Sequence, residues 1–502
     1  MSSSRFDFTL PVPPAEQLGG VHFIAIGGSG MSGVARMFLA RGVPVSGSDQ
    51  QDSPTLRSVE QAGARVHVGH HADHLGEART VVVSSAIRED NPELVAARQA
   101  GLRVLHRSQG IAALLHGRLA VAVAGANGKT TTSALTVAAL QAAGADPGYV
   151  IGAPLASSGV SSAPGSGADP IVIEADESDG SFLTYRPQVA VVTNVQPDHL
   201  DFYGDAEAVE QAYRDFVSTI APGGLLVTSV DDEGAARLAR HAADTGVRVL
   251  TWGSRDGTDV DVRLDDVRSE GTSSTGTLTF GTDTAAIPAG TSLRLRLPVP
   301  GEHNVHNAAA AVLVAGAGFG LPLEAAAQGL EHFAGAHRRF ERVGASGAVE
   351  VVDDYAHNAS KVAAAVRAAR AAAAGRRLVV TFQPHLFSRT RDFAEGFVDG
   401  LAAADVVVLL PVYAARERQQ DYPDISSGLL ARGLRGLGEA APDVREVGSV
   451  AEAAPALAEL LADEQDTLVV TIGAGDVTQV GAQLLTLLED AVRRDPAPEV
   501  LP

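Results

Sequence analysis

The chain has 502 residues, 45% of them hydrophobic, with a formal net charge of −21 and no cysteine. This length exceeds what a single core organises, so roughly three domains are expected, and the missing cysteines exclude disulfides and thiolate metal sites. No basic tract offsets the negative charge, which argues against a nucleic-acid partner. No stretch resembles a signal peptide or a membrane span, so we expect a cytoplasmic protein without membrane insertion.

The first block predicts strands alternating with helices. An apolar run over 21–26 precedes a Gly-rich turn and a helix over 31–41, and further strands are expected over 43–48, 66–68 and 80–84. This alternation predicts a parallel sheet. The turn holds Gly28-Ser29-Gly30-Met31-Ser32-Gly33, and Asp49 ends the next strand. The pattern is a dinucleotide fingerprint in its usual setting, although a plain tight turn or a different nucleotide diphosphate would also account for it.

The second block begins with a phosphate-loop pattern. Lysine occurs only at Lys129 and Lys361, and Lys129 lies where an apolar run over 119–124 meets a Thr/Ala-rich helix. Loop amides and the helix N-terminus would hold phosphate, Lys129 would reach the terminal phosphates, and Thr130 would offer its hydroxyl to Mg²⁺. The glycines are separated by two residues, where a strict Walker A motif has four. The loop reads Gly125-Ala126-Asn127-Gly128-Lys129-Thr130-Thr131.

Two acidic segments follow strands predicted over 171–174 and 189–194. One is Glu174-Ala175-Asp176-Glu177-Ser178-Asp179, and the other is Asp198-His199-Leu200-Asp201. Open α/β sheets bind ligands at the carboxyl ends of their strands, so a carboxylate and an imidazole there could hold Mg²⁺ beside the phosphates. A solvated acidic loop with a surface histidine is the alternative for either segment alone.

In the rest of the second block, the spacing of apolar residues changes. Strands over 225–228 and 247–251 continue the parallel pattern, whereas 260–264, 277–280 and 293–297 alternate with period two and predict antiparallel pairing. A helix is expected over 304–316, and the stretch 157–168 is expected to be a mobile loop.

The third block, from about Gly335, predicts another doubly wound α/β domain with strands over 349–353, 377–381, 406–410 and 467–472. Two polar segments follow strands here, 353–358 and 383–391. Their charged and aromatic side chains could close over an ATP site. For His357 and His385 individually, capping or packing is the simpler interpretation.

Taken together, these segments resemble the Mur ligase family, and within it the branch that adds L-alanine to UDP-N-acetylmuramate. The resemblance covers nearly the whole chain. It implies an α/β fold of three domains: a Rossmann-like domain over 1–117 that binds UDP-N-acetylmuramate, a P-loop ATPase-type domain over 118–335 with an antiparallel insertion, and a Rossmann-like domain over 336–492. A disordered tail is expected over 493–502. The segments that carry it are 26–33, 174–181, 198–204, 338–341, 353–357 and 382–385.

The resemblance also implies a reaction. ATP, UDP-N-acetylmuramate and L-alanine would give ADP, phosphate and the alanyl amide, a step of peptidoglycan precursor synthesis. The muramyl carboxylate would attack the γ-phosphate to form an acyl phosphate, which the amine then displaces. The first Gly-rich turn would therefore hold a UDP group and no nicotinamide. A monomer or weak homodimer is expected.

The same resemblance assigns roles to individual residues. Catalysis would involve Lys129, Glu174, His199 and His357, and Mg²⁺ would be held by Thr130, Glu174 and His199. ATP would contact the loop residues Gly125, Ala126, Asn127, Gly128, Lys129, Thr130 and Thr131, together with Asn304, Arg339 and Asp354. Tyr355, His385 and Arg389 would face the amino acid and the acyl phosphate. The UDP-sugar would contact Gly28, Ser29, Gly30, Met31, Ser32, Asp49 and Ser84.

Two segments depart from the family pattern. The usual Gly-Thr-His-Gly-Lys-Thr is Gly-Ala-Asn-Gly-Lys-Thr over 125–130. Backbone amides do the cradling, so ATP binding should survive this change. The usual Tyr-Ala/Gly-His-His-Pro-Thr-Glu is Tyr-Ala-His-Asn-Ala-Ser-Lys over 355–361, so that Lys361 stands where an acid is usual. Amino-acid selectivity or rate could change. The carbamylated lysine of some sibling ligases is not expected, because no lysine lies between His199 and Lys361.

Three alternative functions stay open at this stage. Within the family, a recycling ligase would attach a preformed tripeptide to the same nucleotide. An NAD-dependent oxidoreductase would use the first Gly-rich turn. A non-catalytic nucleotide-binding paralogue is suggested by Ala126, Asn127 and Lys361. Sequence alone does not separate L-alanine from glycine or L-serine, since one small group changes binding by only about 1–3 kcal/mol.

Overall fold

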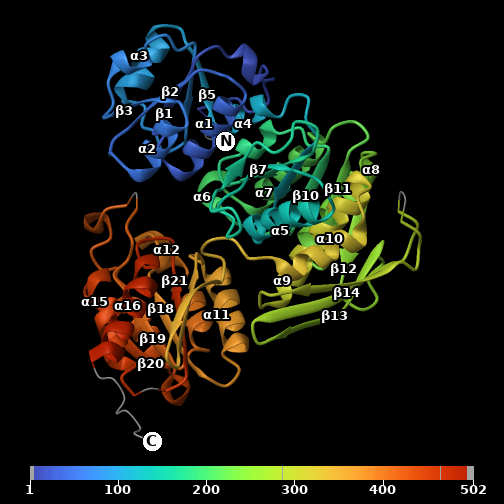
Figure 1. The fold of residues 1–502 in the computed structure, drawn as a ribbon. Coiled ribbons are helices and arrows are strands. Elements are labelled where there is room, and N and C mark those ends of the chain that lie inside the picture. The colour runs from blue at the N-terminus through green and yellow to red at the C-terminus, as the bar shows by residue number, and fades with distance from the viewer. Residues whose placement is uncertain (1–4, 285–286, 416, 464, 495–502) are drawn as a thin grey trace, which may run out of the picture. The chain divides into compact units, whose positions relative to one another are not determined.

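Three β-sheets organise the chain in the computed structural model, which describes residues 5–284, 287–415, 417–463 and 465–494 (Figure 1). The first compact unit is built from residues up to 267 together with 275–297 and 303–334, and it holds two of the sheets. The second unit is built around residues from 335 onward and holds the third sheet. The predicted three-domain α/β fold is confirmed.

The N-terminal sheet is parallel with strand order β3-β2-β1-β4-β5. From β1 the chain continues outward to β2 and β3 on one side, and from β4 it continues to β5 on the other side. The carboxyl ends of β1 and β4 therefore form a switch point, where such folds bind ligands. The strands are β1 (Val21–Ile24), β2 (Val45–Asp49), β3 (Arg65–Val68), β4 (Thr80–Val83) and β5 (Arg103–His106); the helices are α1 (Ser29–Ala40), α2 (Pro54–Gln61), α3 (Pro92–Gln99) and α4 (Arg107–Leu114).

The central sheet has ten strands in the order β15-β14-β13-β12-β11-β10-β6-β9-β7-β8. Its apolar middle strands β6, β9 and β10 are parallel neighbours, which brings the loops after them to one edge. The strands are β6 (Ala120–Ala124), β7 (Gly148–Val150), β8 (Ser162–Ala163), β9 (Ile171–Glu174), β10 (Val189–Val192), β11 (Leu225–Ser229), β12 (Arg248–Gly253), β13 (Val262–Glu270), β14 (Ser273–Phe280) and β15 (Ser292–Leu297). The helices are α5 (Lys129–Ala142), α6 (Leu200–Tyr203), α7 (Ala206–Ser218), α8 (Glu233–Asp244), α9 (Glu302–Leu313) and α10 (Leu323–Gly329).

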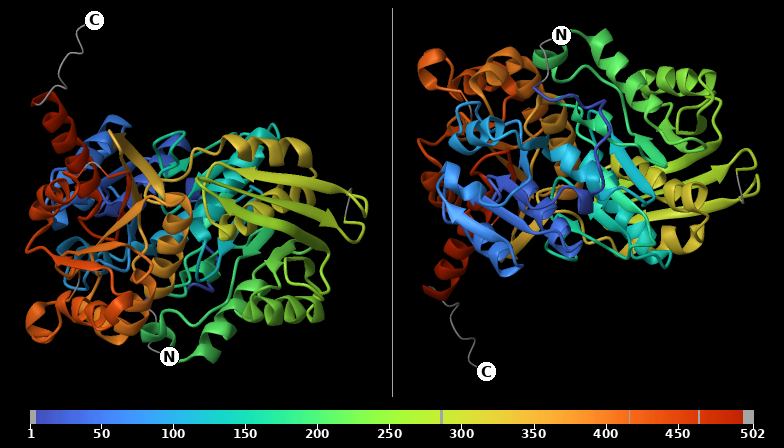
Figure 2. Two further views of the ribbon diagram at one scale, coloured as in Figure 1. Left: turned by 90° about the horizontal axis from the view of Figure 1, so that it is seen from below. Right: turned by 90° about the horizontal axis from the view of Figure 1, so that it is seen from above.

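The period-two segments form the far end of this same sheet, as the long strands in Figure 2 show. Strands β13 and β14 are neighbours joined by only two residues, a connection that only antiparallel strands can make. Strand β13 itself pairs with β12 in parallel, which the sequence did not predict. The predicted loop 157–168 contains strand β8, which pairs antiparallel with β7. The helix expected over 304–316 is α9 followed by a π-helical turn over Val314–Gly318.

The C-terminal sheet has the order β16-β17-β21-β18-β19-β20. Only β16 is antiparallel to its neighbour among the described pairs, so the predicted doubly wound domain carries one antiparallel edge strand. Helix α16 includes Arg493 and Arg494 of the predicted tail, and the rest of that tail lies outside the described residues. The strands are β16 (Glu341–Ser346), β17 (Val349–Asp354), β18 (Arg377–Phe382), β19 (Val406–Leu409), β20 (Asp443–Glu446) and β21 (Thr467–Ile472); the helices are α11 (Ala359–Ala373), α12 (Phe387–Asp392), α13 (Ala394–Leu401), α14 (Gly428–Arg435), α15 (Val450–Leu460) and α16 (Thr478–Arg494).

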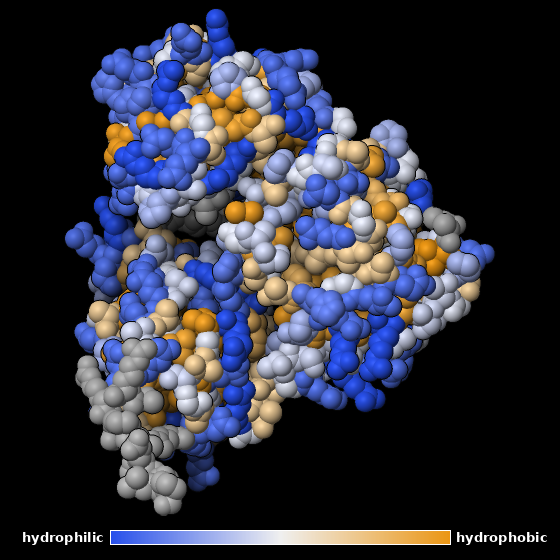
Figure 3. All heavy atoms as spheres, viewed as in Figure 1, coloured by the Kyte–Doolittle hydropathy of each residue, from blue (hydrophilic) through white to orange (hydrophobic). Residues whose placement is uncertain are grey.

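On the face drawn in Figure 3, hydrophilic residues predominate and hydrophobic ones form small, scattered groups. Among the residues whose structure is described, no helix combines the length and the apolar character that crossing a membrane requires.

Candidate active site

The phosphate-loop pattern forms the turn between β6 and α5, as the sequence predicted. Gly125 has φ +136°, and a Cβ there would collide with the hydroxyl of Thr193 and approach the amide of Asn194 to 3.1 Å. Glycine is therefore required for the loop to pass this close to the end of β10. The loop leads into the first turn of α5, where the backbone amides of a helix N-terminus can hold an anion.

Side chains after β10 hold the loop through its backbone. Asn194 accepts the amide of Asn127 at 2.9 Å and donates to the carbonyl of Asn127 at 3.0 Å. Thr193 donates its hydroxyl to that same carbonyl at 2.6 Å. The Asn127 side chain donates to Gln196 at 3.1 Å. The contacts of Thr193 and Asn194 with the loop were not predicted, because nothing in the motif itself marks these two residues.

Lys129 is paired inside the loop. Its Nζ donates to the carbonyl of Gly125 at 2.8 Å and to a carboxylate oxygen of Glu177, also at 2.8 Å. The Lys129 side chain is 13% exposed and that of Glu177 only 3%. Burial disfavours the ammonium, but the carboxylates of Glu177, Asp176 and Glu174 outweigh burial and raise the pKa of Lys129. The ammonium therefore stays charged at neutral pH. Glu177 lies in the acidic segment 174–179, but its pairing with Lys129 was not predicted.

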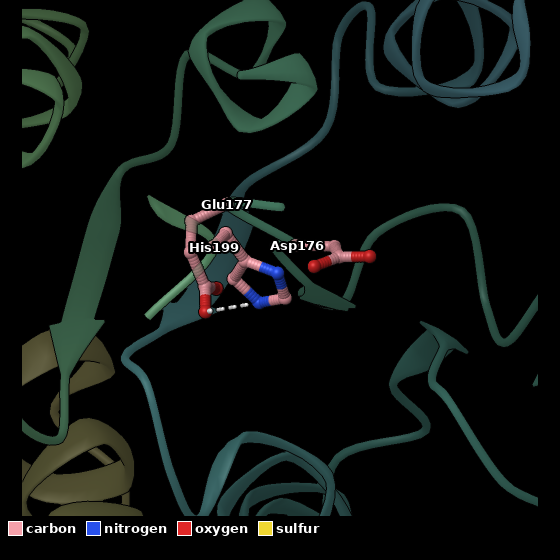
Figure 4. Close-up of side chains that lie close together, drawn as sticks. All are labelled: Asp176, Glu177 and His199. Carbon is pink, nitrogen blue, oxygen red and sulfur yellow. Dashed lines mark ion pairs between the residues drawn. The ribbon is translucent and has the colours of Figure 1, made fainter. Parts of the chain in front are cut away.

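Asp176, Glu177 and His199 form a compact group of possible metal ligands, with one ligand atom of each within 4.8 Å of the others. Figure 4 shows the His199 ring between the two carboxylates, with its Nε2 at 3.7 Å from Glu177. His199 has φ +55° and caps helix α6, so its backbone turns sharply at this point. Oxygen donors of this kind suit a hard cation such as Mg²⁺.

The three predicted metal ligands do not form one group. Thr130 and Glu174 are bonded to each other, whereas His199 lies beside Glu177. Thr130 donates its hydroxyl to Glu174 at 3.0 Å, and the other Glu174 oxygen accepts the amide of Gly152 at 2.7 Å. His199 pairs with Glu177 instead. The structure thus adds Asp176 and Glu177 to the acidic groups gathered around the phosphate loop.

Helix α9 contacts the phosphate-loop helix through one of two neighbouring buried asparagines. Thr132 donates to Asn307 at 3.0 Å, and Asn307 donates to Asn304 at 3.2 Å. The predicted ATP residue Asn304 therefore lies one side chain away from α5. Asn307, which the sequence analysis missed, makes the direct contact.

The N-terminal fingerprint forms the turn into α1 at the switch point. Asp49 accepts the amide of Gly27 at 3.0 Å, which ties the end of β2 to that turn. A Cβ at Gly30 would collide with the guanidinium of Arg107, so the glycine leaves room for a cation that the sequence analysis missed.

The remaining predicted UDP-sugar residues lie close to this turn. The amides of Met31 and Ser32 bond the carbonyl of Gly28 at 3.0 and 2.9 Å, and both side chains are buried. Ser84 directly follows β4, whose carboxyl end belongs to the switch point. Ser29 opens α1, and its side chain lies outside the described residues.

The predicted C-terminal residues gather within the second compact unit. The guanidinium of Arg339 lies over the Tyr355 ring at 5.0 Å. Asp354, at the end of β17, accepts the amides of Phe340 at 2.9 Å and Ala356 at 2.8 Å. Burial raises the pKa of Asp354, against the opposing charge of Arg339.

Three further predicted residues complete this group. The rings of His357 and His385 are 5.6 Å apart, and Arg389 approaches Nδ1 of His385 at 3.3 Å. Nδ1 of His357 lies 2.9 Å from the carbonyl of Tyr355, so it carries the proton and leaves Nε2 as the acceptor. Burial lowers the pKa of His357 to about 3, helped by Lys361 and Arg389, so the ring is neutral at pH 7.

A Gly-rich turn lies at the switch point of the N-terminal sheet, and a phosphate-loop turn with a paired lysine and neighbouring carboxylates lies at the edge of the central sheet. These features are typical of a nucleotide-dependent α/β enzyme. Sequence profiles of three domains match the chain: the Mur ligase family catalytic domain over 20–118, the Mur ligase middle domain over 123–315, and the Mur ligase glutamate ligase domain over 338–475. The chain belongs to the Mur ligase family.

Its relatives are similar over nearly their whole length. The UDP-N-acetylmuramate--L-alanine ligase of Kineococcus radiotolerans is 50% identical, with 94% of this chain and 97% of the relative covered. The ligase of the same name from a Nocardioides species is 47% identical, with 96% and 99% covered. The solved UDP-N-acetylmuramate-alanine ligase of Thermotoga maritima superposes with a TM-score of 0.75 at 27% identity, covering 94% of this chain and 99% of that one. A murein peptide ligase from Psychrobacter arcticus shares the fold, with a TM-score of 0.68 at 24% identity over 94% of this chain and 98% of that one.

Proposed function

We propose that this protein is an ATP-dependent ligase that joins L-alanine to the carboxylate of UDP-N-acetylmuramate in peptidoglycan precursor synthesis. Relatives of that name, 47–50% identical over nearly the full length, support this activity over the recycling ligase and the oxidoreductase. The structural observation that carries the proposal is the buried Lys129–Glu177 pair in a phosphate loop beside an acidic group.

The chemistry needs charge neutralisation, because a carboxylate must attack the γ-phosphate of ATP and both are anions. Lys129 is charged and lies at the loop, so its ammonium would turn from Glu177 toward the terminal phosphates when ATP binds. The loop amides would hold the phosphate oxygens in place. Attack breaks the bond between the γ-phosphorus and ADP and forms an acyl phosphate. The alanine amine then displaces phosphate and loses a proton to form the amide.

The acidic residues around the loop support a magnesium site. Lys129 is the only lysine of the first compact unit, and its one ammonium does not balance the three carboxylates of Glu174, Asp176 and Glu177. Thr130, Glu174, Asp176, Glu177 and His199 are the side chains that would hold Mg²⁺. When bound, Mg²⁺ would neutralise phosphate charge as the reaction proceeds.

The C-terminal group would bind the amino acid and part of ATP. Its members gather where β17 and β18 end, the edge at which such sheets bind ligands. The neutral His357 can accept a hydrogen bond from the alanine amine at Nε2 without placing a positive charge beside it. We propose ATP contacts for Asn304, Arg339 and Asp354, and amino-acid or acyl-phosphate contacts for Tyr355, His357, His385 and Arg389.

The N-terminal turn would bind the UDP part of the sugar nucleotide. The proposed contacts are the turn over 28–32, Asp49 and Ser84, with Arg107 added because its guanidinium lies at Gly30. Arginine is well suited to a diphosphate, since its donors are arranged in a fixed fork. A cytoplasmic location and a monomeric or weakly dimeric state remain predictions.

A phosphate-release assay tests the proposed function. Enzyme, ATP, Mg²⁺ and UDP-N-acetylmuramate would be combined with L-alanine, glycine, L-serine or the L-alanyl-γ-D-glutamyl-diaminopimelate tripeptide. We expect release with L-alanine to exceed that with glycine or L-serine by roughly 10- to 200-fold. Faster release with the tripeptide would establish the recycling ligase instead. Binding of ATP and UDP-N-acetylmuramate without ADP formation for any acceptor would establish a non-catalytic paralogue, and saturable NADH binding would favour an oxidoreductase.

A further inference from the structure

Three side chains from distant parts of the first compact unit meet in one hydrogen-bonded group. Ser85 follows β4 and His106 ends β5, both in the N-terminal block, whereas Asp179 lies in the acidic loop after β9. The Ser85 hydroxyl lies 2.6 Å from an Asp179 carboxylate oxygen and 3.0 Å from Nε2 of His106. Nε2 of His106 is also 3.6 Å from that same Asp179 oxygen. We call these three residues the junction.

The hydrogen bonds of the junction run in one direction. Nδ1 of His106 accepts the amide of Ser108 at 3.3 Å as part of the N-cap of α4, and the Ser108 hydroxyl lies 2.9 Å from the same nitrogen. With Nδ1 as the acceptor of both, the imidazole proton is assigned to Nε2. Nε2–H then donates to the Ser85 oxygen, and the Ser85 hydroxyl donates to the Asp179 carboxylate. His106 is only 2% exposed, and the rings of Phe6 and Phe8 each lie 5.3 Å from it. The histidine is therefore fixed in both place and tautomer.

The N-terminal end of the junction adjoins the proposed UDP-sugar site. Ser84, a proposed contact of the sugar nucleotide, precedes Ser85 in the chain. Arg107 follows His106, and its guanidinium lies at Gly30 in the turn into α1. A ligand that orders this turn would thus contact residues that are next to Ser85 and His106 in the chain.

The other end of the junction adjoins the phosphate loop. Asp179 is two residues beyond Glu177, the partner of Lys129, and its second oxygen accepts the amide of Ser181 at 3.0 Å. The backbone carbonyl of Glu177 accepts the hydroxyl of Tyr203 at 2.5 Å. Asp179 therefore fixes the same short loop that presents the carboxylates of Asp176 and Glu177.

We propose that Asp179 is a positioning residue, through which the UDP-sugar site and the ATP site of the first compact unit reinforce one another. The idea rests on the proposed function for the identity of the two ligands. Occupancy of the N-terminal turn steadies Ser85 and His106, and these hold Asp179 and the acidic loop in the arrangement that ATP requires. Since coupling is reciprocal, each ligand raises the affinity for the other by the same factor.

Calorimetric titration with adenylyl imidodiphosphate in excess Mg²⁺, with and without saturating UDP-N-acetylmuramate, tests the proposal. In the wild type we expect the sugar nucleotide to tighten analogue binding at least about fivefold, at the low end of typical coupling factors. Ser85→Ala should reduce this factor below about twofold while each ligand alone binds within about threefold of the wild type, because neither binding surface is changed. Asp179→Asn should also reduce the factor.

Two control variants separate positioning from general damage. Ser85→Thr restores the hydroxyl and should restore the coupling. Ser218→Ala removes an exposed hydroxyl that bonds a carbonyl of its own helix, and should leave the coupling unchanged. An unchanged factor in Ser85→Ala, or no coupling in the wild type, would overturn the proposal. Failure of the proposed function would look different: the wild type would release no phosphate with L-alanine, whatever the coupling.

Discussion

The buried pair of Lys129 and Glu177 is the residue-scale feature on which the proposed chemistry depends. The two side chains meet at 2.8 Å, and Glu177 is almost fully enclosed. Removing one partner of a buried pair leaves the other as an uncompensated charge, which typically costs about 3–5 kcal/mol. We therefore propose that this pair holds the acidic loop in place before ATP arrives, and that it would release the Lys129 ammonium to the phosphates when ATP binds.

Replacing Lys129 tests this role. In Lys129→Ala we expect ADP formation to fall at least about 1,000-fold, equivalent to roughly 4 kcal/mol, because the charge at the terminal phosphates is lost. UDP-N-acetylmuramate should still bind within about threefold, since its proposed contacts lie on a different sheet. Phosphate release and calorimetric titration measure the two effects.

An exposed cation provides the matched control. Arg237→Ala also breaks an ion pair in the central block, with Glu210 at 2.6 Å, but at a largely exposed position. Exposed pairs contribute at most about 1 kcal/mol, so turnover should stay close to that of the wild type. Near-normal turnover in Lys129→Ala would refute the mechanism.

Side-chain partners were predictable only where a motif names them. Lys129, Thr130 and Glu174 come from the loop and the strand end, and in the structure Thr130 donates to Glu174. Their roles stay predictions. Glu177 and Arg107 were missed as partners because their contacts depend on how separate loops fold toward one another. A useful signal for Glu177 was present in the sequence: a lone lysine followed by an acid-rich segment.

At the scale of elements, the phosphate loop is held by its backbone. Both the amide and the carbonyl of Asn127 are bonded by Asn194, and the carbonyl also accepts from Thr193. The identity of the side chain at position 127 therefore matters little to the shape of the loop. This agrees with the expectation that the unusual Ala126 and Asn127 leave ATP binding intact.

Exchanging the loop side chain tests that view. Asn127→His restores the usual family residue and should change the affinity for adenylyl imidodiphosphate by less than about threefold, since the bonds of the backbone remain. Asn194→Ala removes two bonds to the loop backbone and should weaken the affinity at least about tenfold, equivalent to roughly 1.4 kcal/mol. Calorimetric titration measures both. A large loss in Asn127→His alone would contradict this view.

The second lysine lies at the start of a helix. Asn358 caps α11 and accepts the amide of Lys361 at 2.9 Å, so a positive charge occupies the third position of the first turn. An acid is preferred there, because it faces the positive end of the helix dipole and can complete a capping box. Lys361→Glu should therefore raise the free energy of unfolding by about 0.5–1 kcal/mol.

Urea denaturation measures this change, with Lys361→Ala as the control. The alanine variant removes the unfavourable charge without adding an acid, so we expect a gain about half as large. Equal or reversed effects would show that Lys361 has a stabilising contact that outweighs the helix dipole.

Most predicted strands were confirmed to within a few residues because parallel sheets leave continuous apolar runs, whereas β13 continues to Glu270, well beyond its predicted end at Leu264. Pairing was harder to predict than the strands themselves. The sequence predicted no strand at β5, β7, β8, β16 or β20. Strand β8 was missed because its sequence is rich in Ser, Gly and Pro, and it exists through pairing with β7. The parallel pairing of β13 with β12 was also missed, since the alternating pattern predicts a half-buried strand but not its neighbour.

For the molecule as a whole, two buried histidines predict acid sensitivity. Burial lowers the pKa of His106 to about 4 and that of His357 to about 3. In the unfolded chain both would titrate near about 6.5, so below that pH the unfolded state binds more protons than the folded state. The free energy of unfolding should therefore fall as the pH is lowered from about 6.5 toward 4, by up to about 1.4 kcal/mol per pH unit for each histidine.

Calorimetry across this pH range, compared between variants, isolates the effect of one histidine. His357→Asn should lose less stability than the wild type as the pH falls, because its side chain does not titrate. His332→Gln replaces an exposed histidine, and its free energy of unfolding should depend on pH as that of the wild type does. If the free energy of unfolding falls equally steeply with pH in the wild type and in His357→Asn, the prediction is refuted.

The scarcity of lysine has a practical consequence for labelling. Each compact unit contains one lysine, Lys129 in the first and Lys361 in the second. Acylating reagents attack only the deprotonated amine, and the pairing of Lys129 with Glu177 keeps its amine protonated and shielded. Mass spectrometry should therefore show Lys361 modified first, and the rate at Lys129 would report directly on how often its pair with Glu177 opens.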